Sequence, residues 1–334
     1  MKAAQIKKYT KEIHVEVNEI EKPAIQANEV LIKVKGAAVN PLDLLNITGS
    51  VKLIQDYPMP LTLGNELTGR IEQVGSGVRN FKIGDAVYTR LPIGKIGAFA
   101  EFVAVDQDSI WYIPKHLDFI SAAAVPLTGL TAYQAFHDIL QAQPGETVFI
   151  PGGSGSFGQM AVPIAKYLGL NVIVSGNATA KDRVLAAGAN QYIDYKTENY
   201  WEVIDQVDYV IDTLGGDDIE RAFSVIKPGG MLVSLIAGPN KQFARDQQLP
   251  KWKEILFSLA GAKLDKIAKK YQVYYRFIFV QADGAQLKEV TAIIEKANIV
   301  PTIEPHVYQL NQVNEAITKV KQGRLQGKVV IQVD

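Results

Sequence analysis

The feature that most constrains the fold is a glycine-rich segment at residues 152–158, which reads Gly-Gly-Ser-Gly-Ser-Phe-Gly. It stands between a stretch typical of a strand (146–150) and one typical of a helix (156–168). Glycine permits a sharp turn, close approach of a phosphate and close packing of the helix on the strand. The N–H groups and dipole at the helix start favour a pyrophosphate. The segment predicts a nucleotide-binding turn rather than a glycine-rich turn without a ligand.

Strands and helices alternate after this turn. Expected strands lie at 171–175, 192–193, 207–212 and 231–236, and expected helices at 180–187 and 217–226. Strands that alternate with helices of this length form right-handed βαβ units around a parallel sheet. An alanine-rich helix is expected before the turn, at 128–140, and a Lys-Pro-Gly-Gly turn at 227–230.

The first part of the chain has a different character. Alternation and β-branched residues predict strands at 1–10, 30–34, 69–74 and 85–89, with a short helical turn near 42–47. A chain of 334 residues exceeds the size of one hydrophobic core, so two domains are expected. An aromatic strand is expected at 273–280, followed by a helix at 286–297 and a strand at 328–333. These last two elements contain no glycine turn of their own, so they are expected to complete the first domain.

The composition argues against several partners and cofactors. Thirty-five basic and 35 acidic residues cancel to a net charge of zero, so neither nucleic acid nor membrane is an expected partner. The chain has no cysteine, which removes disulfides and thiolate-bound metals, and its four histidines are scattered, so no metal site is expected. The N-terminus lacks the apolar stretch of a signal peptide, and no apolar run approaches the ~20 residues of a membrane span. A cytoplasmic protein is expected.

Residues 239–270 are the least regular stretch and include a lysine-rich amphipathic segment at 251–270. Its expected apolar face includes Leu256, Leu259 and Leu264. A helix on a membrane surface is one interpretation, and a helix that covers one end of the sheet is the one we favour.

The choice of nucleotide depends on the end of the strand after the turn, where NAD enzymes place a carboxylate about 20 residues beyond the glycines. Here the chain reads Val-Ser-Gly-Asn at 174–177, without an acid. Lys181 and Arg183 follow and offer positive charge for a 2′-phosphate, although they also fit as ordinary surface charges. No Lys-Ser or Lys-Thr follows the glycines, which disfavours a mononucleotide P-loop. NADPH is therefore favoured over NADH.

Six further motifs stand in a characteristic order: Val-Asn-Pro-Leu-Asp at 39–43, Leu-Gly-Asn-Glu-Leu-Thr-Gly at 63–69, Gly-Asp-Ala-Val-Tyr at 84–88, Gly-Ala-Phe-Ala-Glu-Phe at 97–102, Ala-Val-Pro-Leu-Thr-Gly-Leu-Thr-Ala at 124–132 and Gly-Arg-Leu-Gln-Gly-Lys at 323–328. With the glycine turn they resemble the medium-chain dehydrogenase/reductase superfamily, specifically its zinc-independent NADPH:quinone oxidoreductase (zeta-crystallin-like) branch. The resemblance covers essentially the whole chain. It implies an α/β protein in which a GroES-like β-rich catalytic domain (1–121 and 283–334) is combined with a Rossmann NADP-binding domain (122–282) that has a doubly wound parallel sheet.

The resemblance also implies the site residues, in the cleft between those domains. Asn40, beside the nicotinamide, is the one candidate catalytic residue. The cofactor-binding residues that it implies are the turn (Gly152, Gly153, Ser154, Gly155, Ser156, Phe157 and Gly158), the surroundings of the 2′-phosphate and adenine (Ser175, Gly176, Lys181 and Tyr195), the flanks of the ribose and nicotinamide (Asn40, Thr131, Leu214, Gly215, Ile236, Phe279 and Val280) and Lys328.

Zinc-dependent relatives carry Cys and His ligands at the positions of Val39, Asn40 and Asn65, whereas the acid at Glu66 is retained. Zinc-assisted alcohol oxidation is therefore not expected. The resemblance implies hydride transfer from NADPH to a quinone or an activated carbonyl, with Asn40 or a backbone N–H stabilising the developing oxyanion.

Two alternatives stay open. An enoyl-thioester or 2-alkenal reductase has the same fold and hydride step, and a crystallin-like protein binds NADPH without catalysis. The aromatic strand at 273–280 is expected to pair edge to edge with a second copy in a homodimer.

Overall fold

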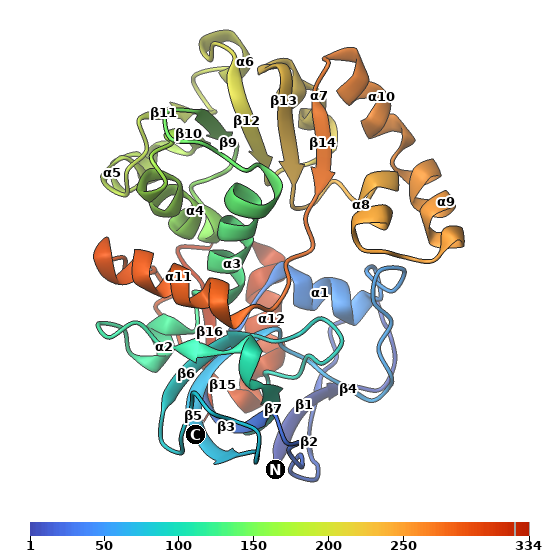
Figure 1. Ribbon diagram of the computed structural model, residues 1–334, viewed down its shortest axis with the longest axis vertical. Coiled ribbons are helices and arrows are strands. Elements are labelled where there is room, and N and C mark those ends of the chain that lie inside the picture. Colours follow the sequence, from blue (N-terminus) through green and yellow to red (C-terminus); the bar gives the residue numbers. More distant parts are fainter. Residues whose placement is uncertain (324, 334) are drawn as a thin grey trace. The chain divides into compact units, whose positions relative to one another are not determined.

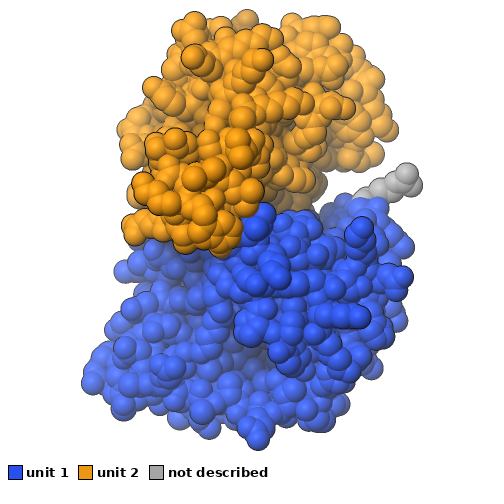
Figure 2. Space-filling model, turned by 90° about the vertical axis from the view of Figure 1, so that its right-hand side faces the viewer, with its two compact units in different colours: residues 1–130, 281–334 blue, residues 131–280 orange. Residues whose placement is uncertain are grey.

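The computed structural model describes residues 1–323 and 325–333, so Arg324 of the closing motif lies outside the described residues. Contacts divide the chain into two units, coloured separately in Figure 2. Unit 1 comprises Met1–Leu130 and Gln281–Asp334, and unit 2 comprises Thr131–Val280. The domain limits expected from the sequence stay a prediction.

Unit 1 is rich in antiparallel strands. A three-stranded sheet has the order β2-β1-β4, from β1 (Lys2–Ile6), β2 (Glu16–Glu19) and β4 (Leu61–Thr62). A seven-stranded sheet has the order β15-β16-β3-β5-β6-β8, with β7 paired to β3. Its strands are β3 (Glu29–Val39), β5 (Glu66–Val74), β6 (Ala86–Arg90), β7 (Phe102–Asp106), β8 (Trp111–Tyr112), β15 (Tyr308–Gln309) and β16 (Val329–Gln332).

The helices of unit 1 are α1 (Pro41–Thr48), α2 (Phe119–Ala122), α11 (Gly284–Lys296) and α12 (Val313–Gln322). The helix α3 (Pro126–Gln134) begins in unit 1 and ends in unit 2. The expected helix at 128–140 corresponds to α3 and a following π-helical turn, Ala135–Ile139. Among the described residues, one helical run, Phe119–Ile139, has the length and composition of a membrane span, but 72% of its most apolar window is buried, as in a core helix.

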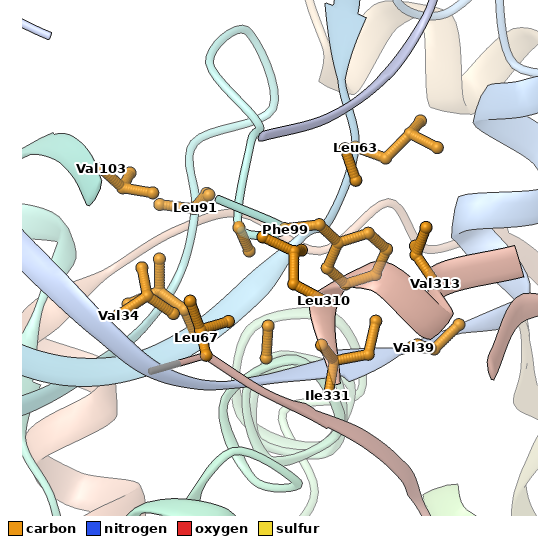
Figure 3. Close-up of a cluster of buried hydrophobic side chains, with 14 of the residues drawn as sticks. Val34, Val39, Leu63, Leu67, Leu91, Phe99, Val103, Leu310, Val313 and Ile331 are labelled. Atoms are coloured by element: carbon orange, nitrogen blue, oxygen red, sulfur yellow. The ribbon is translucent and has the colours of Figure 1, made fainter. Parts of the chain in front are cut away.

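The end of the chain returns to the first strands, as expected. In the antiparallel pair of β16 and β3, Val329 stands opposite Val39. Figure 3 shows the hydrophobic cluster that results, in which Val34 of β3, Leu67 of β5 and Val313 of α12 lie together with Ile331 of β16. This core holds the end of β3, from which α1 begins.

Unit 2 is a parallel α/β domain (Figure 1). Its six strands, in the order β11-β10-β9-β12-β13-β14, are β9 (Thr147–Ile150), β10 (Asn171–Gly176), β11 (Gln191–Asp194), β12 (Val207–Asp212), β13 (Ile226–Ser234) and β14 (Tyr274–Phe277). This is the 3-2-1-4-5-6 order of a doubly wound Rossmann sheet, in which the strand order reverses between β9 and β12. With the β-rich unit 1 and the parallel sheet of unit 2, the α/β fold class predicted from the sequence is confirmed.

The helices of unit 2 are α4 (Ser156–Tyr167), α5 (Lys181–Ala186), α6 (Tyr200–Val203), α7 (Ile219–Ser224), α8 (Lys241–Asp246), α9 (Lys251–Ala260) and α10 (Ala262–Lys270). A buried cluster that includes Phe149, Phe223 and Leu232 packs α7 and α10 against the sheet. The lysine-rich segment is thus two helices separated at Gly261.

The expected turn at 227–230 is instead a bulge within β13. Ile226 stands opposite Val207 and Met231 opposite Tyr209, so four residues of β13 face the single residue Asp208 of β12. The glycines fit because Gly230 lies close to the Asp208 carbonyl, where a Cβ would come within 2.4 Å of the oxygen. The prediction of a turn was wrong because pairing on both sides of the bulge keeps the chain in one strand.

Candidate active site

The glycine turn connects β9 to α4, and three of its glycines differ in their steric surroundings. Gly152 has φ +67°, which favours glycine. A Cβ on Gly158 would lie 1.7 Å from the carbonyl oxygen of Gly153, so only glycine lets α4 pack against the turn. A Cβ on Gly155, the residue before α4, would meet no protein atom closer than 3.8 Å. Gly155 therefore has an open side, as required where a backbone approaches a phosphate.

Two side chains tie the turn to neighbouring elements. The N–H of Gly152 donates to Oγ of Ser175 at 3.3 Å, and Ser175 is buried at the end of β10. The guanidinium of Arg183 on α5 donates to the carbonyl oxygen of Ser154 at 2.8 Å. Arg183 is thus part of the turn's support, a role that its spacing in the sequence did not reveal.

A buried acid that sequence reasoning missed organises the next two strand ends. Oδ1 of Asp212 accepts from the N–H groups of Leu214 (3.1 Å) and Gly215 (2.8 Å), and Oδ2 accepts from the hydroxyl of Ser234 at 2.6 Å. Ser234 Oγ in turn accepts from the N–H of Ile236 at 3.2 Å. The sequence signal that could have revealed Asp212 is an acid at the end of a buried strand with two glycines shortly after it.

Large apolar side chains are exposed at the same edge of the sheet. Leu214 and Ile236 are both at least half exposed, and Leu214 lies against Gly152 while Ile236 lies against Gly215. Exposed apolar groups of this size beside a glycine turn are typical of a surface that a ligand covers. In a doubly wound sheet this carboxyl edge, at the reversal of strand order, is where ligands bind.

The expected 2′-phosphate residues gather at the end of β10. Ser175 and Gly176 close the strand, and the exposed Lys181 begins α5. The N–H of Tyr195 donates to the carbonyl oxygen of Gly176 at 3.2 Å. Asp194 is the nearest strand-end acid, in register with Gly176 on β11, and its Oδ1 accepts from the N–H of Lys196.

Three other predicted residues belong to other segments of unit 2. Thr131 is buried in α3, and Phe279 and Val280 follow β14 at the end of unit 2. Their roles in cofactor binding stay predictions.

In unit 1, Asn40 belongs to a buried cluster with Glu66 and Lys328. Its Nδ2 donates to Glu66 Oε1 at 2.8 Å and to the carbonyl oxygen of Ala38 at 3.2 Å. Its Oδ1 accepts from Nζ of Lys328 at 2.6 Å, and that ammonium lies 2.9 Å from Glu66 Oε1. Glu66 Oε2 accepts from the N–H of Leu127 at 2.7 Å. The Asn40 amide is thus fixed in one orientation with both of its N–H groups engaged.

Asp43 connects this cluster to α1. Its Oδ2 accepts from the N–H of Asn40 at 2.7 Å, which makes a capping box, and its Oδ1 accepts from Nδ2 of Asn65 at 2.7 Å. Burial raises the pKa of Asp43 to about 7, against the lowering effect of these hydrogen bonds and of Lys328. Asp43 therefore has a structural role that also makes it sensitive to pH.

The donors in this cluster do not fit a zinc ion. The positions that resemble zinc ligands hold Asn40 and Asn65, and the chain has no cysteine. The ammonium of Lys328 contacts both Asn40 and Glu66, so a metal at these oxygens would meet a second cation at short range. Residues 1–323 and 325–333 hold no group of three or more His, Cys, Asp or Glu suited to a metal.

Comparison with known proteins identifies the family. Residues 26–115 match the alcohol dehydrogenase GroES-like domain, and residues 187–331 match the zinc-binding dehydrogenase family. The mitochondrial NAD(P)H oxidoreductase RTN4IP1 of Danio rerio is 31% identical over 327 residues, which cover 92% of this chain and 84% of that protein. The chain belongs to the medium-chain dehydrogenase/reductase superfamily.

Two further members of this medium-chain dehydrogenase/reductase superfamily are similar along most of their length. The 2-methylene-furan-3-one reductase of Solanum lycopersicum is 30% identical over 318 residues, covering 92% of this chain and 73% of that protein. The structure of the quinone oxidoreductase from Coxiella burnetii has a TM-score of 0.83 at 27% identity, covering 100% of this chain and 99% of that chain. The family resemblance drawn from the motifs is confirmed, and as a superfamily member the chain is expected to use a nicotinamide dinucleotide.

Proposed function

We propose that this protein reduces quinones or α,β-unsaturated carbonyl compounds with NADPH, without zinc. The observation that carries the proposal is the carboxyl edge of the Rossmann sheet. There, the glycine turn, the loops held by Asp212 and the exposed Leu214 and Ile236 make a surface suited to a dinucleotide. Relatives named as a quinone oxidoreductase and as a furanone reductase support these acceptor classes.

NADPH is proposed over NADH because of the charges at the end of β10. Ser175 and Gly176 stand where an NAD-specific enzyme has a carboxylate, and Lys181 and Arg183 supply positive charge on α5. The cofactor-binding set predicted from the sequence is retained in this proposal, with Arg183 added.

A zinc-independent reaction is proposed because the Asn40, Asn65 and Lys328 positions offer no suitable ligand set. Bound NADPH supplies a hydride from its nicotinamide ring, and the electron pair that the acceptor gains comes to rest on its carbonyl or quinone oxygen. The compensating proton comes from solvent.

We assign the stabilisation of that oxygen to Lys328, with Asn40 as a positioning residue. Both N–H groups of Asn40 already donate to Glu66 and Ala38, whereas the ammonium of Lys328 has three N–H groups and two partners among the described residues. A cation in a buried site stabilises a developing negative charge more strongly than a neutral amide does. The placing of this cluster at the nicotinamide rests on the family resemblance.

The decisive experiment measures binding of NADPH and NADH by fluorescence, followed by cofactor oxidation with quinones, enals, enones and enoyl thioesters. We expect tighter binding of NADPH and turnover of quinones or enones. Turnover restricted to enoyl thioesters would favour the thioester-reductase alternative. Tight NADPH binding without turnover of any acceptor would favour the crystallin-like alternative, and equal affinity for both cofactors would refute the 2′-phosphate assignment.

A homodimer and a cytoplasmic location also stay proposals. Strand β14 is an edge strand of its sheet, which leaves one side for pairing with a second copy. Sedimentation in solution tests the dimer. The zebrafish relative carries a mitochondrial designation in its name, so fractionation of the native cells is the test of location.

A further inference from the structure

Helix α9 exposes an apolar stripe. Trp252, Ile255, Leu256 and Leu259 follow the i, i+3, i+4, i+7 spacing of one helix face, and they are 58%, 64%, 36% and 73% exposed. Phe257 alone is buried in this helix. The neighbouring α10 behaves differently, because its Ile267 and Ala268 pack into the core beneath the sheet. The stripe of α9 is therefore not a face that covers the sheet.

The segment that contains this stripe is rich in positive charge. Residues 240–270 contain eight basic and three acidic residues, a local excess of five charges in a chain whose net charge is zero. Within the described part of the chain, no carboxylate lies within 4.0 Å of five of these lysines: Lys251, Lys253, Lys263, Lys266 and Lys269. Glu254, the one acid of α9, is engaged by Arg245 at 2.8 Å.

A hollow of about 370 Å³ adjoins the stripe between α8 and α9. Its lining combines three cations (Lys241, Arg245 and Lys251) and the acid Glu254 with the apolar side chains Ile255 and Leu259. A space of this kind suits a molecule that has an anionic head beside an apolar chain.

We propose that α9 and the hollow beside it form a docking surface for an anionic lipid bilayer. A short helix with a tryptophan-containing apolar face and flanking lysines binds in the plane of the membrane interface. Its ten residues span about 15 Å, half of the ~30 Å hydrocarbon core, so the helix lies on the membrane and does not cross it. Each lysine near the surface adds attraction to acidic headgroups.

The charges favour a lipid surface over a second copy of the chain. In a two-fold contact through α9, the lysines of one copy would face those of the other, and Glu254, the one acid of α9, is already engaged by Arg245. Nucleic acid would satisfy the lysines but would leave the stripe of Trp252, Ile255 and Leu259 without an apolar partner. An anionic membrane matches both halves of the surface.

The test is flotation of the full-length protein with phosphatidylcholine vesicles that contain or lack phosphatidylserine. We expect binding to the anionic vesicles alone, weakening as salt rises. Trp252→Ala combined with Leu259→Ser should abolish it. Lys251→Gln and Lys263→Gln should each weaken it about fivefold, because each lysine contributes about 1 kcal/mol near the surface.

A matched control keeps the result specific. Ile83 is 65% exposed in unit 1 beside Lys82, so the double variant Ile83→Ser, Lys82→Gln changes the same chemistry elsewhere and should bind normally. No flotation at low salt, or an equal loss in the control variant, would overturn the proposal. A stripe variant that changes the oligomeric state but still floats with the vesicles would also overturn the proposal.

The docking proposal is independent of the proposed reaction. The variants of α9 and the Lys263→Gln variant of α10 should oxidise NADPH with a water-soluble quinone at the wild-type rate. The lysine variants keep the proposal testable if the stripe variant misfolds. They replace exposed groups that make no ion pair within the described residues, so they should fold normally.

Discussion

The ammonium of Lys328 lies 2.9 Å from Oε1 of Glu66, with the two side chains 5% and 0% exposed. The pair joins the start of β16 to the start of β5, and it holds the Asn40 amide as a third member. A buried ion pair is strongly destabilised when one partner is removed, because the remaining charge stays in a poorly solvating environment. The pair therefore connects the stability of unit 1 with the chemistry proposed for it.

Replacing Lys328 with Met should lower the free energy of unfolding by about 3–5 kcal/mol, since Glu66 is left buried without its cation. Urea denaturation measures this loss, and adding Glu66→Gln should restore part of it. Lys227→Met, which removes an exposed pair with Asp208 at 2.8 Å, is the control and should cause little change. An equal effect of Lys328→Met and Lys227→Met would contradict the prediction.

Asp43 should make unit 1 less stable as pH rises. Burial raises its pKa from 3.8 to about 7, so between these values the folded protein keeps a proton that the unfolded chain has lost. The contribution of Asp43 to the free energy of unfolding is fully present below the pKa of the unfolded chain. It declines by at most about 1.4 kcal/mol per pH unit until the pH reaches the pKa of the folded protein. Urea denaturation across this window should show the decline in the wild type and a flatter profile in Asp43→Asn. Parallel profiles would refute the assignment.

Gly155 and Gly158 should respond differently to alanine. Gly158→Ala places a Cβ 1.7 Å from the Gly153 oxygen and should disrupt the turn and destabilise unit 2. Gly155→Ala meets no protein atom within 3.8 Å and should leave the melting temperature unchanged. If the turn binds the pyrophosphate, Gly155→Ala should nevertheless weaken dinucleotide binding, because the Cβ occupies the approach side. Unchanged affinity in folded Gly155→Ala would argue against that binding mode.

Variants of Lys181 and Arg183 should distinguish recognition of the 2′-phosphate charge from structural support of the glycine turn. Lys181→Ala should raise KM for NADPH and leave NADH unchanged, because only NADPH carries the 2′-phosphate. Arg183→Ala also removes the 2.8 Å hydrogen bond to the Ser154 carbonyl and should impair both cofactors. Lys196→Ala, on the exposed turn after β11, is the control. Steady-state kinetics with both cofactors tests this, and an unchanged KM for NADPH in Lys181→Ala would remove that residue from the site.

The sequence by itself determined the elements whose signal is local. A glycine turn between a strand and a helix, followed by alternating strands and helices, is enough to predict a Rossmann sheet, because each unit depends on nearby residues. The end of β10 without an acid is also local, and so is the absence of cysteine. From these came the fold class and the expected nucleotide.

Only the tertiary structure decided which distant groups meet. Asp212 and Ser234 are 22 positions apart, and Asn40 and Lys328 are 288 apart, yet each pair shares a hydrogen bond that no spacing in the sequence indicates. The amphipathic pattern at 251–270 predicted an apolar face, but packing determined that Ile267 faces the core while Leu259 faces outward. A periodic pattern defines the face of a helix, and the surrounding elements decide whether that face is covered. The zero net charge is a sum over the chain and includes a local excess of five positive charges in residues 240–270, which the structure distributes over α8, α9 and α10.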